Sequence, residues 1–311
     1  MYSGLAGRDV LSIGDLTRED IEAVLSCAAD QKRARAAGDA SPTPLTGKSV
    51  GMIFQRPSNR TRVSFEVAIH QLGGHPIPLF SQEIQLGERE SVGDIARILD
   101  RYLDGIVARV YNQADLEDMA ANADAPVINA MTDAEHPCQV LADLLTVREH
   151  AGPDAVVTYL GDGNNVCNSW ILAAAIMGFE LRLVIPEGYE PRHQVVKRAR
   201  ALGAREPERT WAINTALADT AIVYTDVWTS MGKEQERERR RRDFAEMQVN
   251  TDLLKLAPPS ARVMHCLPAH RGEEITDEVI DGPQSIVFDQ AENRLHVQKA
   301  LLTLIYAPLV G

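Results

Sequence analysis

Residues 54–66, FQRPSNRTRVSFE, bring together groups that bind phosphate. Ser58 and Thr61 offer hydroxyls, Asn59 offers an amide, and the guanidinium of Arg60 can hold two phosphate oxygens. The stretch lies between the apolar run VGMIF and a helical pattern, so free N–H groups of a helix N-terminus would also face an anion. The pattern GxxxxGK[ST] is missing, which argues against a nucleotide P-loop. A capped helix with arginines facing solvent is the alternative.

His136 and Gln139 form a second polar pair, in the segment HPCQVLADLLTV. They are three residues apart, so they share one face at the start of a predicted helix, with Pro137 at a position where proline is favoured. A neutral imidazole and an amide can together polarise a carbonyl and recognise an amide NH2. Two structural caps are the alternative.

Two further polar segments each follow a predicted strand. Asn164 and Asn165 lie in LGDGNNVCNS, which lacks the GxGxxG pattern of a dinucleotide site. Asp226 begins DVWTSMG and is followed by Ser230 and Met231. An acidic side chain beside a thioether suits a substrate with a cationic amine and an aliphatic stem. Turn-forming asparagines and a capping aspartate beside a packed methionine are the alternatives.

The segment MHCLPAHRGEE ends another predicted strand and places Cys266 at its carboxyl end. His265, Cys266 and His270 have a spacing that matches no zinc pattern, so we expect no metal here. Arg294 is predicted to lie in about the first turn of the last helix, where a single arginine would by itself be an ordinary surface residue.

The elements that must position these groups alternate between strands and helices along the whole chain. Such alternation predicts parallel sheets with right-handed crossovers. The pattern restarts after GPDA, which predicts two βα halves with a boundary in the helix from about 136 to 150. The charged segment GKEQERERRRRDFAEM is predicted to form a solvated helix, with an anion-binding arm as the alternative.

Composition narrows the class of protein. The chain has 311 residues and a formal net charge of −12, which argues against non-specific nucleic-acid binding. Its four cysteines form no CxxC pair, which favours a reducing, cytoplasmic location without a disulfide framework. The N-terminus has no signal-peptide pattern, and no apolar run is long enough to span a membrane.

Taken together, the separated motifs HPCQVLADLLTV, GDGNNV, DVWTSMG, HCLPAHRGEE and FDQAENRLHVQKALL resemble the ornithine branch of the aspartate/ornithine carbamoyltransferase family. The resemblance covers nearly the whole chain. It implies an α/β fold of two domains, each a mostly parallel sheet flanked by helices, linked by long helices. Residues 1–140 would bind carbamoyl phosphate, with a C-terminal helix of about 291–311 packing back onto them, and residues 141–290 would bind ornithine.

The same resemblance implies the site residues. Those expected to bind carbamoyl phosphate are Ser58, Asn59, Arg60, Thr61, Gln85, Arg109, His136, Gln139, Cys266, Leu267 and Arg294. Those expected to bind ornithine are Asn165, Asp226, Ser230 and Met231, and the catalytic set is Arg109, His136, Asp226 and Cys266. No cofactor, metal, nucleic acid or membrane is implied. The resemblance does imply a homotrimer or an assembly of trimers, in which Gln85 contributes to the site of a neighbouring subunit.

One position departs from the family pattern. The family loop has the sequence Ser-Thr-Arg-Thr-Arg, and here Asn59 replaces the first threonine. Asparagine is favoured at a helix entrance and its NH2 can donate to a phosphate oxygen, so we expect the loop to keep its role.

The acceptor favoured by the sequence is L-ornithine. Asp226 and Met231 suit a zwitterion with a cationic amine, whereas aspartate would call for added arginine or lysine. Another amino acid or amine is the first alternative. A non-catalytic ligand-binding homologue is the second, although Arg109, His136, Cys266 and Arg294 are all present. The sequence does not separate arginine synthesis from the reverse direction.

Overall fold

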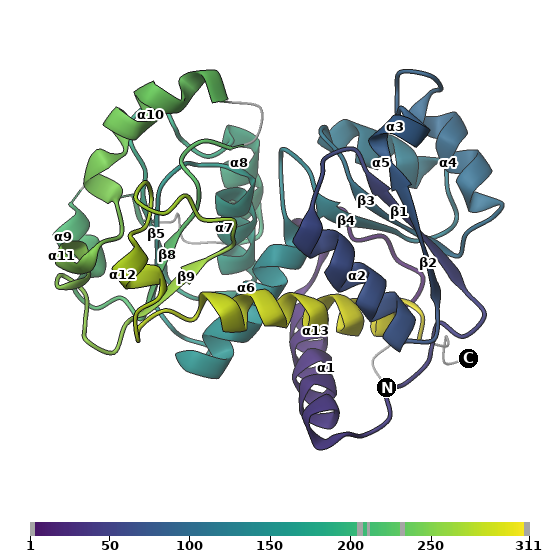
Figure 1. The fold of residues 1–311 in the computed structure, drawn as a ribbon, viewed down its shortest axis with the longest axis horizontal. Helices are drawn as coiled ribbons and strands as arrows, with labels where there is room; N and C mark the ends of the chain where they lie inside the picture. The colour runs from purple at the N-terminus through teal and green to yellow at the C-terminus, as the bar shows by residue number, and fades with distance from the viewer. Residues whose placement is uncertain (1–3, 204–207, 210–211, 231–233, 308–311) are drawn as a thin grey trace. The chain divides into compact units, whose positions relative to one another are not determined.

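The computed structural model describes residues 4–203, 208–209, 212–230 and 234–307. The chain divides into two compact units (Figure 1). The first unit comprises Met1–Leu145 with Asn293–Gly311, and the second comprises Thr146–Glu292. Both divisions fall inside helices, α6 (Pro137–His150) and α13 (Val287–Ile305), so these two long helices link the units.

The first unit is built on a parallel sheet in the order β2-β1-β3-β4. Its strands are β1 (Ser49–Phe54), β2 (His75–Phe80), β3 (Gly105–Arg109) and β4 (Val127–Met131). Phe54 pairs with Phe80 and Arg109, and Arg109 pairs with Met131. The segments that follow all four strands therefore leave the sheet at one edge, where ligands of open α/β sheets bind.

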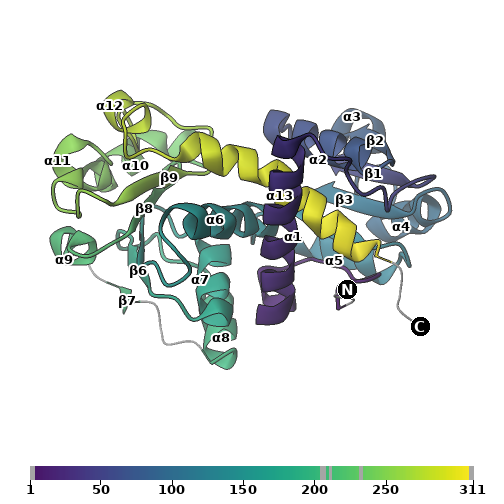
Figure 2. The same cartoon turned by 90° about the horizontal axis from the view of Figure 1, so that it is seen from below.

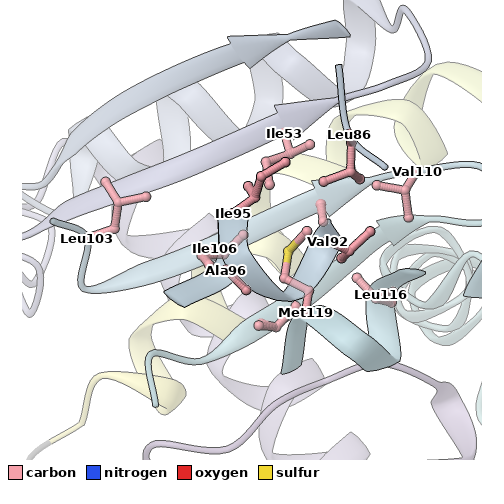
Figure 3. Close-up of a cluster of buried hydrophobic side chains, with 12 residues drawn as sticks. Ile53, Leu86, Val92, Ile95, Ala96, Leu103, Ile106, Val110, Leu116 and Met119 are labelled. Atoms are coloured by element: carbon pink, nitrogen blue, oxygen red, sulfur yellow. The ribbon is translucent and has the colours of Figure 1, made fainter. Parts of the chain in front are cut away.

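Apolar side chains pack one face of this sheet against two helices. Ile95 of α4 (Val92–Asp100) and Met119 of α5 (Gln113–Ala121) lie with Ile53, Ile106 and other side chains in one buried cluster (Figure 3). The unit also contains α1 (Arg18–Ala37), α2 (Asn59–Gln71), α3 (Ser81–Ile84) and the 3-10 turn η1 (Ile13–Asp15). The predicted capping box of α1 is confirmed, because Thr17 and Asp20 each accept the other's backbone N–H.

Strand β2 lies at the open edge of the sheet and carries Pro76 and Pro78. The N–H of His75 donates to the carbonyl of Lys48 at 2.9 Å, so the backbone of residue 75 faces β1. Since backbone groups alternate in direction along a strand, the nitrogens of the two prolines face away from β1. Proline is accepted at such positions because no ladder hydrogen bond is lost.

The second unit is built on a five-stranded parallel sheet in the order β7-β6-β5-β8-β9. Leu160 pairs with Val184 and Thr225, and Thr225 pairs with His265. The strands are β5 (Val157–Leu160), β6 (Leu181–Val184), β7 (Glu208–Arg209), β8 (Ile222–Thr225) and β9 (Arg262–His265). Here too the polar segments after β5, β8 and β9 begin at one edge.

Helices α7 (Asn165–Met177) and α8 (His193–Ala201) lie side by side on one side of this sheet (Figures 1 and 2). Helices α11 (Thr251–Leu254) and α12 (Asp277–Ile280) lie on the other side in both views. The remaining elements are α9 (Ile213–Leu217), α10 (Arg237–Asp243), η2 (Glu234–Glu236) and η3 (Ala245–Met247). None of the helices among the described residues combines the length and apolar character needed to cross a membrane.

The predicted fold, two mostly parallel sheets flanked by helices, is confirmed. One local prediction was wrong. Helix α13 begins at Val287, so Arg294 lies in its third turn, because the residues before Glu292 join the helix. The predicted solvated helix is confirmed as α10, whose residues are all exposed except Arg240, which is 3% exposed.

Candidate active site

The loop after β1 leads directly into the N-terminus of α2. Ser58 is the N-cap, and its hydroxyl accepts the N–H of Thr61 at 3.2 Å. Asn59 therefore occupies the first helical position and not the cap itself, and both Asn59 and Arg60 are exposed. A capped helix end with an amide and a guanidinium beside it can attract an anion, and the phosphate-binding role of this loop stays a prediction.

Three predicted residues that are far apart in the sequence meet in one buried network. Arg294 is 4% exposed and donates from Nη2 to the Thr61 hydroxyl and from Nη1 to the Gln139 side-chain carbonyl, each at 2.9 Å. Because Thr61 accepts this hydrogen bond, its own O–H is still available as a donor. One guanidinium from α13 thus fixes side chains of α2 and α6.

Asp143 extends this network and lies outside the predicted set of site residues. The Gln139 amide nitrogen donates to Asp143 Oδ1 at 2.8 Å, and Asp143 is fully buried. With its nitrogen on Asp143 and its oxygen on Arg294, the amide of Gln139 has a defined orientation. The signal was available, because Asp143 follows Gln139 by four residues and so shares its helix face.

His136 and Arg109 lie at the same sheet edge. Arg109 ends β3, and His136 directly precedes α6, which begins at Pro137, one residue after the predicted start. The pKa of His136 is well below its ordinary value. The main cause is burial of the ring, and the positive charges of Arg294 and Arg109 further disfavour the protonated imidazole. The imidazole is therefore neutral at physiological pH and offers one N–H donor.

A cavity of about 470 Å³ opens beside the α2 N-terminus. Its lining residues are Phe54, Pro57, Ser58, Asn59, Arg62, Phe80, Ser81 and Gln82. Ser58 and Asn59 belong to the predicted set, whereas Thr61, Gln139 and Arg294 do not line this cavity. The guanidinium of Arg62 lies 5.9 Å from the centre of the Phe80 ring and 3.7 Å from Glu66.

Two predicted site residues have unusual backbones. Gln85, which follows α3, has φ of 41°, and Leu267 in the second unit has φ of 58°. In the described part of the chain these are the only residues other than glycine with positive φ. Such conformations are costly and often occur at functional sites. The backbone N–H of Gln85 donates to Ser81, and its carbonyl accepts from Glu88 and Arg89, so among the described residues these backbone hydrogen bonds join Gln85 to no other predicted site residue.

In the second unit, Asp226 is the centre of a polar cluster at the end of β8. Its Oδ1 accepts the Cys266 thiol at 2.9 Å and the N–H of Val227 at 2.7 Å. Its Oδ2 accepts the side-chain amide of Asn164 at 2.6 Å. The structure therefore joins Asp226 and Cys266, which the sequence placed at the ends of two strands.

The contact between Asp226 and the β5–α7 turn is made by Asn164, whereas Asn165 was the predicted ligand residue. Asn164 caps α7 by accepting the N–H groups of Val166 and Cys167. Asn165 occupies the first helical position, and its side-chain oxygen accepts the N–H of Val166 at 3.0 Å. Its predicted role toward a ligand stays a prediction, as does that of Leu267.

Possible metal ligands occur in two groups within this unit. One comprises Asp226, His265 and Cys266. However, His265 Nε2 lies 3.0 Å from Glu274, and its Nδ1 accepts the N–H of Leu267, so both ring nitrogens are already engaged.

The other group of possible ligands comprises His270, Glu273 and Glu274. Glu273 forms an ion pair with Arg237, and Glu274 accepts from His265 and from the N–H of His270. Both carboxylates already have partners within the chain. The expectation that the site holds no metal stays a prediction.

The acceptor loop is described only in part. Ser230 is half-buried and follows the buried residues Trp228 and Thr229. Met231, predicted to contact the substrate stem, lies outside the described residues.

Comparison with known proteins covers both units. The carbamoyl-P binding domain of aspartate/ornithine carbamoyltransferases matches residues 8–149, and the Asp/Orn binding domain of the same family matches residues 154–305. The ornithine carbamoyltransferase of Methanosarcina mazei is 53% identical over 298 residues, covering 95% of this chain and 98% of the relative.

Relatives with solved structures agree. An anabolic ornithine carbamoyltransferase of Pyrococcus furiosus is 49% identical over 310 residues, covering 98% of each chain. A solved structure of the enzyme from P. furiosus matches with a TM-score of 0.94 at 48% identity, covering 99% of this chain and 100% of that chain. The anabolic enzyme from Campylobacter jejuni matches with a TM-score of 0.90 at 35% identity, covering 96% and 98%.

Proposed function

Because this chain belongs to the aspartate/ornithine carbamoyltransferase family, we propose that it transfers the carbamoyl group of carbamoyl phosphate to the δ-amine of L-ornithine, giving L-citrulline and phosphate. The observation that carries the proposal is the buried network in which Arg294 holds Thr61 and Gln139. It brings together, in one unit, residues from three separate motifs. Arginine biosynthesis is the pathway, in keeping with the anabolic relative from P. furiosus.

The first unit is assigned to carbamoyl phosphate. Ser58, Asn59 and Arg60 surround the exposed N-terminus of α2, where the helix dipole and free N–H groups favour a phosphate dianion. Arg60 adds charge-assisted hydrogen bonds to the same group. As the carbamoyl–oxygen bond breaks, negative charge moves onto this phosphate, so the same donors stabilise the leaving group.

The carbonyl oxygen is assigned to Arg109, His136 and the Thr61 hydroxyl. The attack of the amine places negative charge on this oxygen in the tetrahedral transition state. A donor aimed at such charge is typically worth about 2.7–4 kcal/mol. His136 suits this role because its lowered pKa keeps the ring neutral, so it donates a hydrogen bond without becoming a competing acid. Gln139 is assigned to the carbamoyl NH2.

The second unit is assigned to ornithine. The carboxylate of Asp226 is assigned to orient the substrate amine by accepting its N–H groups, and Cys266 and Asn164 fix the orientation of that carboxylate. The proposed acceptor site is completed by Asn165, Ser230 and Met231. Together these residues also contact the α-amino-acid end of ornithine. The δ-amine attacks in its neutral form, and the proton that its nitrogen loses passes to the departing phosphate, so no side chain is assigned as its general base. Holding amine and carbonyl in place supplies much of the remaining acceleration.

The assembly and location are proposed on the family relationship. A homotrimer, or an assembly of trimers, would give Gln85 its role in the site of a neighbouring subunit, and the unusual backbone of Gln85 supports a special function. A cytoplasmic location agrees with the free cysteines. No cofactor enters the proposed reaction.

The test is colorimetric detection of citrulline from carbamoyl phosphate and ornithine, with circular dichroism to show that the protein is folded. Product that depends on both substrates is expected. A folded protein that forms no citrulline at millimolar substrates would refute the proposal. A panel of other amines in the same assay separates ornithine from a different acceptor, which would give the higher kcat/KM if it were the true substrate.

A further inference from the structure

Arg240 is buried in a helix whose other arginines are exposed. Its Nη1 donates to the Asp162 carboxylate at 2.8 Å and to the carbonyl of Trp228 at 2.7 Å. Its Nε donates to Glu236 at 2.8 Å, and its guanidinium lies 4.8 Å from the centre of the Tyr189 ring. One side chain thereby holds an acid, a backbone carbonyl and an aromatic face from separate segments.

Two of these contacts hold the loops that carry the acceptor site. Asp162 lies two residues before Asn164, whose N–H donates to the Asp162 carbonyl at 2.7 Å. Trp228 lies two residues after Asp226, and Asn164 donates to Asp226 at 2.6 Å. Arg240 therefore closes a ring of contacts that runs through Asp162, Asn164, Asp226 and Trp228.

The turn that contains Asp162 is tightly packed at its next residue, Gly163. A Cβ at Gly163 would lie 2.3 Å from the backbone nitrogen of Pro191 and 2.5 Å from the carbonyl of Tyr189. The N–H of Gly163 donates to that same carbonyl at 2.9 Å. The turn is thus held both by the carbonyl of Tyr189 and by the guanidinium of Arg240.

Stability alone is a weak reason for such an arrangement. Arg240 and Asp162 are both almost fully buried, and a well-packed apolar pair of similar volume is often at least as stable as a buried ion pair. An apolar pair cannot form directional hydrogen bonds, whereas Arg240 donates both to the carboxylate of Asp162 and to the carbonyl of Trp228. The geometry therefore favours a role in orienting the two loops.

We propose that Arg240 is a positioning residue for the acceptor amine. It sets the distance between the Asp162–Asn164 turn and the Asp226–Trp228 segment, and so fixes the carboxylate of Asp226 toward the substrate. The inference rests on the proposed function, because the acceptor is ornithine. It adds a residue that touches neither substrate and that acts through Asp162 and Trp228.

The test compares Arg240→Gln with Arg242→Gln in the citrulline assay. Arg242 lies on the same helix and is exposed, so its replacement removes the same charge without touching the ring of contacts. For Arg240→Gln we expect kcat/KM for ornithine to fall about 10- to 100-fold, as for small misplacements of reacting groups, chiefly through a higher KM. The KM for carbamoyl phosphate should match that of Arg242→Gln.

A second pair of measurements separates positioning from folding. Asp162→Asn should also raise the ornithine KM. In the double variant with Arg240→Gln the rise in KM should be less than the two single effects combined, because both changes break the same contact. Methylguanidinium should partly restore the ornithine KM of Arg240→Ala, whereas methylammonium should not.

Each outcome has a defined meaning. An active wild type with equal ornithine KM values for Arg240→Gln and Arg242→Gln overturns the inference and leaves the proposed function standing. Equal rises in both substrate KM values, or a loss of folded protein without rescue by methylguanidinium, also overturn it, since they indicate a structural role only. A wild type that makes no citrulline refutes the proposed function instead.

Discussion

Replacing Thr61 by valine removes one hydroxyl from the centre of the proposed carbamoyl site while keeping the shape of the side chain. Thr61 is 1% exposed, and its oxygen accepts a hydrogen bond from Arg294 at 2.9 Å. Its own proton is the donor that we assign to the carbonyl oxygen. The substitution therefore has two separable effects, one on stability and one on the transition state.

The two magnitudes follow from these contacts. A hydrogen bond from a charged group contributes about 1.5–3 kcal/mol, so the free energy of unfolding should fall by about that amount. Loss of one donor to the developing oxyanion costs about 2.7–4 kcal/mol, or roughly 10²–10³-fold in kcat. Because Arg109 and His136 are proposed to share this oxygen, we expect the lower end of that range.

The assay is steady-state citrulline formation, with thermal unfolding measured on the same samples. Thr61→Ser is the matched control, since it keeps the hydroxyl and loses only a methyl group. Its kcat should stay close to that of the wild type. If Thr61→Val keeps kcat within about threefold of Thr61→Ser, a difference below 1 kcal/mol, the hydroxyl is not a donor in the transition state.

Three further changes test neighbouring parts of the first unit. Asn59→Thr should keep kcat and alter mainly the KM for carbamoyl phosphate, because Asn59 is exposed at the first helical position; a large loss of turnover would reveal a further role. Asp143→Ala leaves the buried amide of Gln139 without its acceptor, at a cost of about 1–3 kcal/mol, so urea unfolding should show lower stability and kinetics a higher carbamoyl phosphate KM. The folded-state pKa of His136 is lowered by burial and then by Arg294 and Arg109, so the unfolded chain takes up this proton first and stability should fall as pH drops below about 6.5. Urea titrations at several pH values should show a shallower acid-side decline for His136→Gln, and an unchanged decline would contradict a neutral, buried imidazole.

Much of the fold was predictable because local patterns and packing agree. Alternating apolar strands and amphipathic helices placed both parallel sheets, and Thr17 with Asp20 marked the start of α1. The start of α13 was missed because Phe288 is exposed while Val287 is buried, so the first turn lacks a clear apolar face. Short helices such as α11, with four residues, carry too little periodicity to be detected.

The site was predictable where residues belong to motifs, and less so where contacts cross the chain. Sequence spacing placed Asp226 and Cys266 at the carboxyl ends of two strands, and the structure joins them by a hydrogen bond. Arg294 looked ordinary because its partners lie 155 and 233 residues away along the chain. Arg240 was hidden for a related reason. Only the tertiary fold brings Asp162 to one arginine among several in a charged helix.

The two prolines of β2 also affect how the chain behaves before and during folding. An open strand edge normally offers a row of N–H groups to which another chain can add a strand. Pro76 and Pro78 occupy the positions whose nitrogens face that open edge, so these two donors are missing. The first unit therefore carries a built-in barrier to edge-to-edge aggregation. Its refolding yield at high protein concentration should depend on two residues that lie outside the proposed catalytic site.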